Sequence, residues 1–137
     1  MKEGWRGDHY FILFEGSELA EKQTAYKIDV RLPGFQVLGF LGWDDFLVQD
    51  ASGKVYTVPT VPLTAAALAE WLGVIDQGAL NPDDRFRTKI KWYKQPLIFG
   101  GDPTHGENMV WVPHDAHVDL VNYWNDVHSR VSSPQMP

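Results

Sequence analysis

The spacing of apolar residues divides the first quarter of the chain into three short elements. Residues 9–14 form a short apolar and aromatic run, which predicts a buried strand. A short helix is expected next, from Ser17 as its N-cap to about Lys22. Over residues 26–32, apolar and charged residues alternate, which predicts a second strand. It would end at the proline-glycine turn at 33–34.

The middle of the chain predicts a β-hairpin. An apolar run at 35–40 is interrupted by Gly42, and two further β-rich runs follow at 46–48 and 55–58. An Asp-Ala-Ser-Gly segment at 50–53 separates these two runs. Two β-rich runs joined by a short Asp/Gly segment are typical of a hairpin.

Two prolines, Pro59 and Pro62, are expected to end the hairpin because proline has no N–H to donate to a strand ladder. Thr64 then stands where an N-cap would begin a helix over residues 65–72, and Gly73 stands where a helix would close.

The last third predicts two strands and a long helix. Polar and apolar positions alternate over 85–92, which favours a strand, and a second strand is expected over 108–112. Apolar residues then recur at steps of three and four up to residue 131, which predicts an amphipathic helix that begins at 114–117. Because helices and strands do not alternate regularly, the fold class is predicted to be α+β with a mainly antiparallel sheet.

Composition sets limits on the class of protein. The chain has 137 residues, 44% of them hydrophobic, which fits one domain over 1–131 followed by a flexible tail at 132–137. Cysteine is absent, which excludes disulfides, thiolate metal sites and a cysteine nucleophile. The longest apolar run is too short for a secretory signal or a membrane span. We therefore expect a cytoplasmic protein with no membrane partner.

Charge is distributed unevenly along the chain. The net charge is -6, yet five of the 12 basic residues fall within 85–94. The other basic residues face all 18 acidic residues, so the rest of the chain is strongly acidic. An acidic body disfavours nucleic acid as a general partner and favours a basic one.

A stripe of basic residues is the best-defined charged pattern. One interpretation is an anion-binding face with Trp92 and Tyr93 stacked on nucleic-acid bases. The other is a solvent-facing strand that its charges keep from aggregating, and the acidity of the remaining chain favours it. The stripe comprises Arg85, Arg87, Lys89, Lys91 and Lys94.

Two adjacent acids, Asp44 and Asp45, raise the question of a catalytic carboxylate pair. On a strand, neighbouring side chains point to opposite faces, so these two would not share one site. We expect them to lie at a turn or at the entry of a strand, with carboxylates available to a partner.

Residues 99–117 combine histidines, acids and glycines and could form a metal site. His114 and His117 are spaced to lie on one face of a helix, and Asp102 and His105 could complete a ligand set. No recognised third-ligand spacing occurs, so we interpret the stretch as a turn at 100–103, a strand and a helix start. The chain also lacks nucleophile-elbow and phosphate-loop motifs, and we expect no catalysis and no metal or other cofactor.

The order of several motifs resembles the SUKH superfamily from about residue 8 to residue 125. The resemblance rests on an LPGF turn at 32–35, a G-x-D-x-x-x-x-x-D-x-x-G-K-V-Y hairpin at 42–56, and a terminal pattern of Asn108, Trp111, His117 and Trp124-Asn125. Two features depart from the family. The helices that usually precede the first strand are missing, and LGWDD replaces the glycine-rich run before the hairpin.

The resemblance implies a strongly bent antiparallel sheet with helices packed on it, and a binding role. SUKH proteins include a yeast regulator of cell-wall glucan synthesis and bacterial immunity proteins that block toxins, chiefly nucleases and deaminases, by direct contact. We therefore expect a non-catalytic protein that binds a basic toxin domain. The candidate contact residues are Trp43, Asp44, Asp45, Asp83 and Asp84.

Three other functions stay open. The first is a regulatory or scaffold module of the same fold with another protein partner. The second is a metal-dependent or sugar-active enzyme, such as a hydrolase, that uses the acid and histidines within 102–117. The third is a nucleic-acid binder that uses the basic stripe.

Overall fold

The computed structural model describes residues 1–73, 80–87, 89–93 and 108–132. Six antiparallel strands form one sheet in the order β1-β2-β3-β4-β5-β6, and two further strands form a second antiparallel pair. The fold is α+β with antiparallel strand pairing, as predicted. In chain order the elements are β1 (Lys2–Arg6), β2 (His9–Leu13), α1 (Glu18–Ala25), α2 (Ile28–Arg31), β3 (Gln36–Leu41), β4 (Asp45–Gln49), β5 (Val55–Pro59), the 3-10 turn η1 (Ala65–Ala67), β6 (Ala69–Glu70), β7 (Lys89–Tyr93), β8 (Met109–Pro113) and α3 (His114–Ser132).

The central strands form as the sequence predicts. β3, β4 and β5 are consecutive antiparallel neighbours, and the turn between β4 and β5 lies over residues 50–53. The Asp50 carboxylate stabilises this turn because its Oδ1 accepts the backbone N–H groups of Ser52 (2.9 Å) and Lys54 (3.0 Å). Gly53 completes it with a φ of 92°, a backbone conformation that favours glycine.

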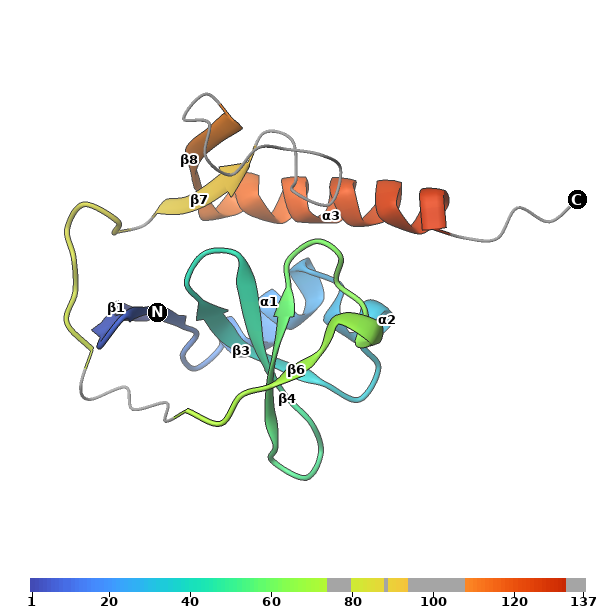
Figure 1. Cartoon of the computed structure of the whole chain (residues 1–137), viewed down its shortest axis with the longest axis horizontal. Helices are drawn as coiled ribbons and strands as arrows, with labels where there is room; N and C mark the ends of the chain where they lie inside the picture. Colours follow the sequence, from blue (N-terminus) through green and yellow to red (C-terminus); the bar gives the residue numbers. More distant parts are fainter. Residues whose placement is uncertain (74–79, 88, 94–107, 133–137) are drawn as a thin grey trace, which may run out of the picture.

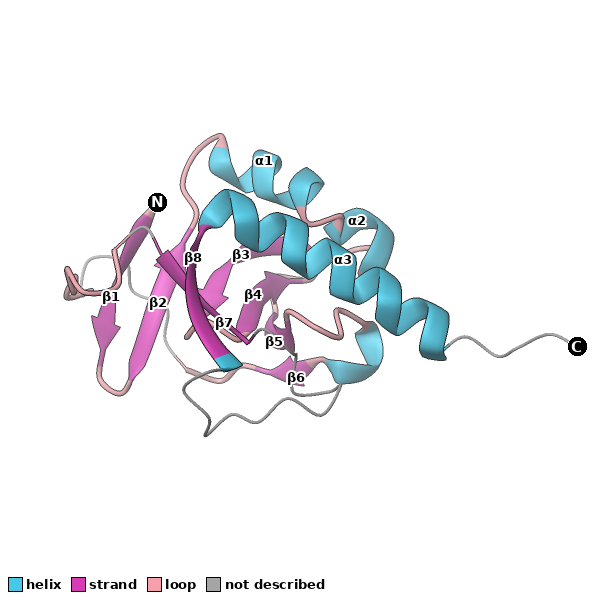
Figure 2. Cartoon of the chain, turned by 90° about the horizontal axis from the view of Figure 1, so that it is seen from above, coloured by secondary structure: helices cyan, strands magenta, loops and turns pink. Residues whose placement is uncertain are grey.

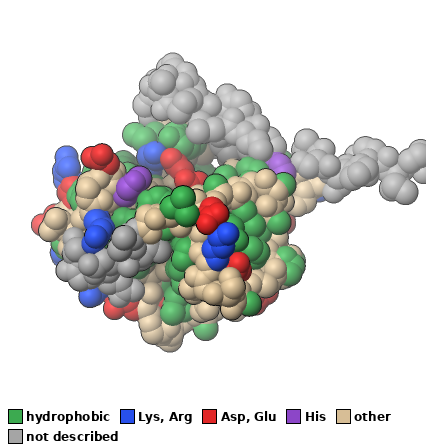
Figure 3. All heavy atoms as spheres, turned by 60° about the horizontal axis from the view of Figure 1, so that its bottom comes forward, with side chains coloured by type: hydrophobic (Ala, Val, Ile, Leu, Met, Phe, Trp, Pro, Cys, Tyr) green, Lys and Arg blue, Asp and Glu red, His purple; other side chains and the backbone are tan. Residues whose placement is uncertain are grey.

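The two faces of the six-stranded sheet are covered differently. Helix α3 and the β7–β8 pair lie over one face, with α1 and α2 beside α3 (Figures 1 and 2). The main core lies on this face, where Val121 of α3 and Ile90 and Trp92 of β7 pack against the sheet. The other face holds a smaller cluster around Phe11, Leu13 and Leu47, and apolar side chains reach the surface there (Figure 3).

The prediction of a strand over 26–32 is wrong, because α2 occupies its centre. Ile28 and Leu32 are four residues apart, so in this helical segment they share a face and are both buried. Val30 lies between them and is 77% exposed, whereas a strand would have placed it beside the other two. Lys27 separates α1 from α2 with a left-handed backbone conformation, φ 57°.

The prediction of a helix over 65–72 is also wrong beyond its first turn. Only Ala65–Ala67 is helical, as a 3-10 turn, and Ala69–Glu70 forms the edge strand β6 against β5. The backbone N–H of Trp71 continues this pairing with the carbonyl of Val55 at 3.0 Å. Pairing with the open edge of β5 therefore outweighs the helix propensity of the alanines.

The strand expected over 85–92 is shorter and begins later. Arg85 and Arg87 lie in a turn, in which the N–H of Phe86 bonds to the carbonyl of Asp83 at 3.0 Å, and the strand covers Lys89–Tyr93. The strand predicted near residue 110 and the C-terminal helix are both present as β8 and α3. The turn predicted at 100–103, Lys94 and most of the predicted tail lie outside the described residues.

Candidate functional site

The acidic pair lies where β3 turns into β4. Asp44 is in the turn, and Nζ of Lys91 in β7 lies 3.2 Å from its Oδ2. Asp45 is the first residue of β4 and is in register with Leu41 and Pro59. Burial and the negative charge of Asp44 raise the pKa of Asp45. The two carboxylates thus have different neighbours, in agreement with the strand-entry role expected for them.

The indole of Trp43 is the centre of an aromatic cluster. Its ring centroid lies 5.0 Å from those of Tyr10 and Phe86. Trp111 lies 5.3 Å away and Trp5 6.3 Å away. Tyr10 is buried beneath the cluster, and the other four side chains are partly exposed. These rings come from five separate segments of the chain, so only the fold brings them together.

Ion pairs surround the exposed rings. The Arg85 guanidinium donates two hydrogen bonds to Asp83, from Nε at 3.0 Å and from a terminal nitrogen at 2.7 Å. The backbone N–H of Arg85 and Nε1 of Trp5 each donate another at 3.1 Å. The bonds from Arg85 hold the pKa of Asp83 well below its usual range. Asp84 pairs with Arg87 at 3.4 Å. We call this region, together with the Asp44 pair, the aromatic–ionic surface; it comprises Trp5, Trp43, Phe86, Trp111, Asp44, Asp83, Asp84, Arg85, Arg87 and Lys91.

Four of the five candidate contact residues therefore belong to this surface, and Asp45 does not. Three residues of the basic stripe, which the sequence presented as a separate feature, also belong to this surface: Arg85, Arg87 and Lys91. Three stripe cations are each paired with an acid, and the Lys91 ammonium also lies 5.0 Å from the centre of the Tyr93 ring. Trp92 is only 6% exposed and packs in the main core, so its ring is not available to stack on a base.

Of the two histidines at the start of α3, His117 is buried and His114 is partly buried. A hydrogen bond of 2.7 Å joins Nδ1 of the fully buried His117 to the hydroxyl of Tyr26. Burial lowers the pKa of His117 to about 3 and that of His114 to about 4. Asp102 and His105 lie outside the described residues. Within the described ranges, no three His, Asp or Glu side chains lie close enough to hold a metal ion.

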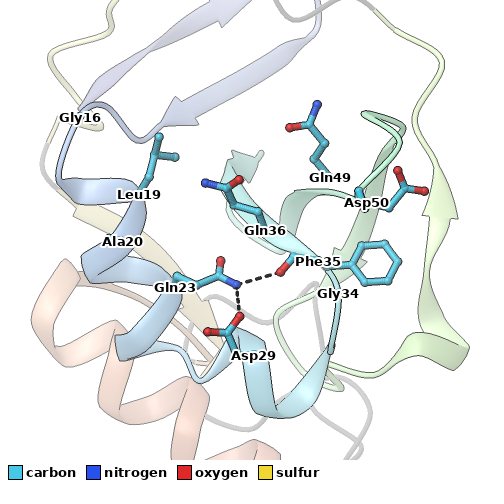
Figure 4. Close-up of a pocket in the computed structure, with 11 residues that line it drawn as sticks. Gly16, Leu19, Ala20, Gln23, Asp29, Gly34, Phe35, Gln36, Gln49 and Asp50 are labelled. Carbon is cyan, nitrogen blue, oxygen red and sulfur yellow. Dashed lines mark hydrogen bonds between the residues drawn. The ribbon is translucent and has the colours of Figure 1, made fainter.

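A second region, an open groove of about 640 Å³, lies at the other end of the β3–β4 pair (Figure 4). We call it the amide groove because three glutamines line it. It is bounded by α1, by the start of α2, by the entry to β3 and by the turn after β4. Its lining residues are Gly16, Leu19, Ala20, Gln23, Asp29, Gly34, Phe35, Gln36, Gln49, Asp50 and Ala51.

Gln23 holds the two walls of the amide groove together. Its Nε2 donates to the backbone carbonyl of Phe35 at 2.8 Å and to Oδ1 of Asp29 at 2.6 Å (Figure 4). Its Oε1 accepts the backbone N–H of Val37 at 2.8 Å. These bonds use the hydrogen-bonding groups of one amide to join α1, α2 and β3, so the groove is formed before any ligand arrives.

Sequence reasoning did not predict the amide groove. Its polar side chains come from α1, α2, β3 and the end of β4, and they follow no spacing that indicates a site. The LPGF turn was singled out for the family resemblance and supplies Phe35, but no pattern linked that turn to Gln23 or Gln49. Only the antiparallel register, in which Gln36 lies opposite Gln49, places the two amides side by side.

No protein-family model, curated protein or solved structure matches this chain. The SUKH resemblance, the binding role and the absence of catalysis therefore stay predictions. None of the helices in the described part of the chain combines the length and the apolar character needed to cross a membrane.

Proposed function

We propose that this protein is a non-catalytic binding domain that contacts a protein partner through the aromatic–ionic surface. The observation that carries the proposal is a group of four partly exposed aromatic rings, Trp43 and the three rings around it, of which three are tryptophans. Tryptophan and arginine are enriched among residues that dominate binding energy, and such residues cluster near the centre of an interface. Here both residue types lie in one patch.

The ion pairs at this surface bear on which partner it would bind. Asp44 is 51% exposed while its partner Lys91 is 18% exposed, so the carboxylate is the more accessible member of that pair. A basic partner could bond to its outer side, and the net charge of -6 would speed the encounter. By contrast, Asp83 is 15% exposed and already accepts hydrogen bonds from Trp5 and Arg85, so we assign it a positioning role.

With the SUKH resemblance, the proposed partner is a basic toxin domain of the nuclease or deaminase type, and the protein is its immunity protein. A regulatory or scaffold module of the same fold would use the same kind of surface with another partner. Neutralisation separates these two proposals. An immunity protein must suppress the lethality of a toxin when the two are expressed together.

The test uses pull-down from the native cell, followed by co-expression with the captured protein or with a toxin-like neighbouring reading frame. We expect Trp43→Ala and the charge reversal Asp44→Lys to abolish capture and protection. Tyr123→Ala is the matched control, because this aromatic residue lies on α3 and is 56% exposed. Circular dichroism confirms that each variant is folded.

Two results would contradict the proposal. If Trp43→Ala and Asp44→Lys both leave capture of the partner unchanged, the aromatic–ionic surface is not part of the interface. Capture without any suppression of toxicity would reject the immunity role and favour the regulatory module.

A further inference from the structure

The amide groove is large enough to hold a small ligand. Its volume of about 640 Å³ falls within the usual range for ligand sites. Leu19, Ala20 and Phe35 give it apolar surface, and the Phe35 ring is held edge-on against Tyr56 at 5.6 Å. Because Gln23 already ties the walls together, little ordering is needed when a ligand binds.

Two carboxamides in the groove keep hydrogen-bonding capacity for a ligand. Gln36 is exposed, and Gln49 lies opposite it in the strand register (Figure 4). Gln49 uses its Nε2 to bond the carbonyl of Gly53 at 3.1 Å, which leaves its Oε1 as an acceptor. An amide both donates and accepts, so the two side chains match the alternating N–H and C=O groups of a peptide backbone.

The charge of the groove is negative and is not balanced by its own lining. Asp29 and Asp50 are its charged members, and no basic residue is among the described residues that line it. Hydrogen bonds from Ser52 and other groups of its turn lower the pKa of Asp50, so this carboxylate is ionised at neutral pH. Lys54 follows the turn, where Asp50 attracts its charge, but its ammonium pairs with Glu70 at 3.3 Å and Lys54 is not among the lining residues.

These features disfavour an anionic ligand and favour a cationic one. We propose that the amide groove binds an extended peptide segment that carries one arginine or lysine side chain. The negative charges of Asp29 and Asp50, on opposite sides of the groove (Figure 4), together attract the side-chain cation. The peptide backbone bonds to Gln36 and Gln49, and the apolar stem of the side chain packs on Phe35. The site is separate from the aromatic–ionic surface and does not depend on the proposed function.

The experiment is an NMR titration of the full-length, nitrogen-15-labelled protein with two blocked tripeptides. One is acetyl-Ala-Arg-Ala-amide, and the other carries citrulline, the neutral isostere of arginine. We expect the arginine peptide to shift backbone and side-chain amide signals of Gln36, Gln49 and their neighbours. The citrulline peptide should bind about fivefold more weakly, since it lacks the charge that the two carboxylates attract.

Substitutions identify the groups responsible. Asp29→Asn keeps an oxygen that can accept the bond from Gln23, so the groove stays intact while one charge is lost. This variant should weaken arginine-peptide binding about threefold and leave citrulline-peptide binding unchanged. Asp119→Asn removes one negative charge from an exposed position on α3 and is the matched control, with no change expected.

Three results would overturn the proposal: equal affinity for the two peptides, shifts confined to residues outside the groove, or no shift at about 10 mM peptide. Failure of the groove can be told apart from failure of the proposed function. A partner whose capture requires Trp43 but tolerates Asp29→Asn, together with a silent peptide titration, would retain the aromatic–ionic surface and reject the groove.

Discussion

The two ends of the β3–β4 pair carry similar acidic residues in opposite electrostatic settings. At the turn end, Asp44 is paired with Lys91, which reaches it from β7. At the open end, Asp29 and Asp50 accept hydrogen bonds from neutral groups, and none of the described residues that line the groove is basic. The net charge of a chain therefore does not say where its charge is available. Here the turn end offers aromatic area, and the open end offers negative potential.

Removing the central ring of each end should give the largest difference in stability. Trp43→Ala deletes an indole that contacts four other rings, so we expect the free energy of unfolding to fall by about 3 kcal/mol. Phe35→Ala removes a partly exposed ring that packs on Tyr56, and the loss should be about 1.5 kcal/mol. Urea unfolding followed by circular dichroism measures both. Equal losses would show that the aromatic cluster adds no packing beyond that of a single half-buried ring.

Acidification should destabilise the core while one acid at each end keeps its charge. The pKa of Asp83 at the turn end and that of Asp50 at the open end are both lowered, so both acids keep their charge at pH 5. The pKa of the buried His117 is lowered to about 3, whereas an unfolded chain gives about 6.5. Below pH 6.5 the unfolded state therefore binds more protons than the folded state. The buried, neutral His117 stabilises the folded protein fully above pH 6.5, and this contribution is lost as the pH falls.

Between pH 7 and pH 5 this histidine alone should lower the free energy of unfolding by about 2 kcal/mol. Urea unfolding at pH 7, 6 and 5 measures the slope. His9→Gln is the control, because it replaces an exposed histidine and keeps the buried ones. A flat profile between pH 7 and pH 5 would mean that His117 is protonated in the folded protein.

Neutralising one acid at each end should give the smallest changes in stability, a loss at the turn end and no loss at the open end. Asp44→Asn breaks the pair with the half-buried Lys91, and we expect a loss of about 0.5–1 kcal/mol that shrinks at high salt. Asp29→Asn removes a charge that has no basic neighbour in the groove lining, so stability should stay the same or rise slightly. Thermal melts at low and high salt compare the two variants. A larger loss of stability from Asp29→Asn than from Asp44→Asn would contradict the assignment of a compensated acid to the turn end and an uncompensated one to the open end.

Local patterning predicted the elements whose partners are close in sequence. The β4–β5 hairpin formed as expected because its turn residues satisfy their own backbone, and α3 formed because its apolar spacing is long and regular. Patterning failed where a short segment suits two structures. Residues 26–32 alternate like a strand, but Ile28 and Leu32 also match a helix, and contact with the core decided between them.

The candidate site was predicted only in part. The five proposed contact residues were named from charge and aromaticity, and the fold placed four of them in one surface. The sequence did not show that Asp44 would meet Lys91, 47 positions away, or that Trp43 would meet Trp111. Such contacts depend on how β7 and β8 pack against the sheet, which local spacing does not encode.

The sequence by itself determined the α+β class, the central hairpin, the C-terminal helix and the excess of acidic residues, because each depends on neighbours along the chain. Only the tertiary structure decided which charges are compensated and which remain available. Ion pairs and grooves form between segments that are distant in sequence, so their energies depend on packing and register. For this protein, that packing placed cations beside the acids of the aromatic–ionic surface and left the lining of the amide groove without them.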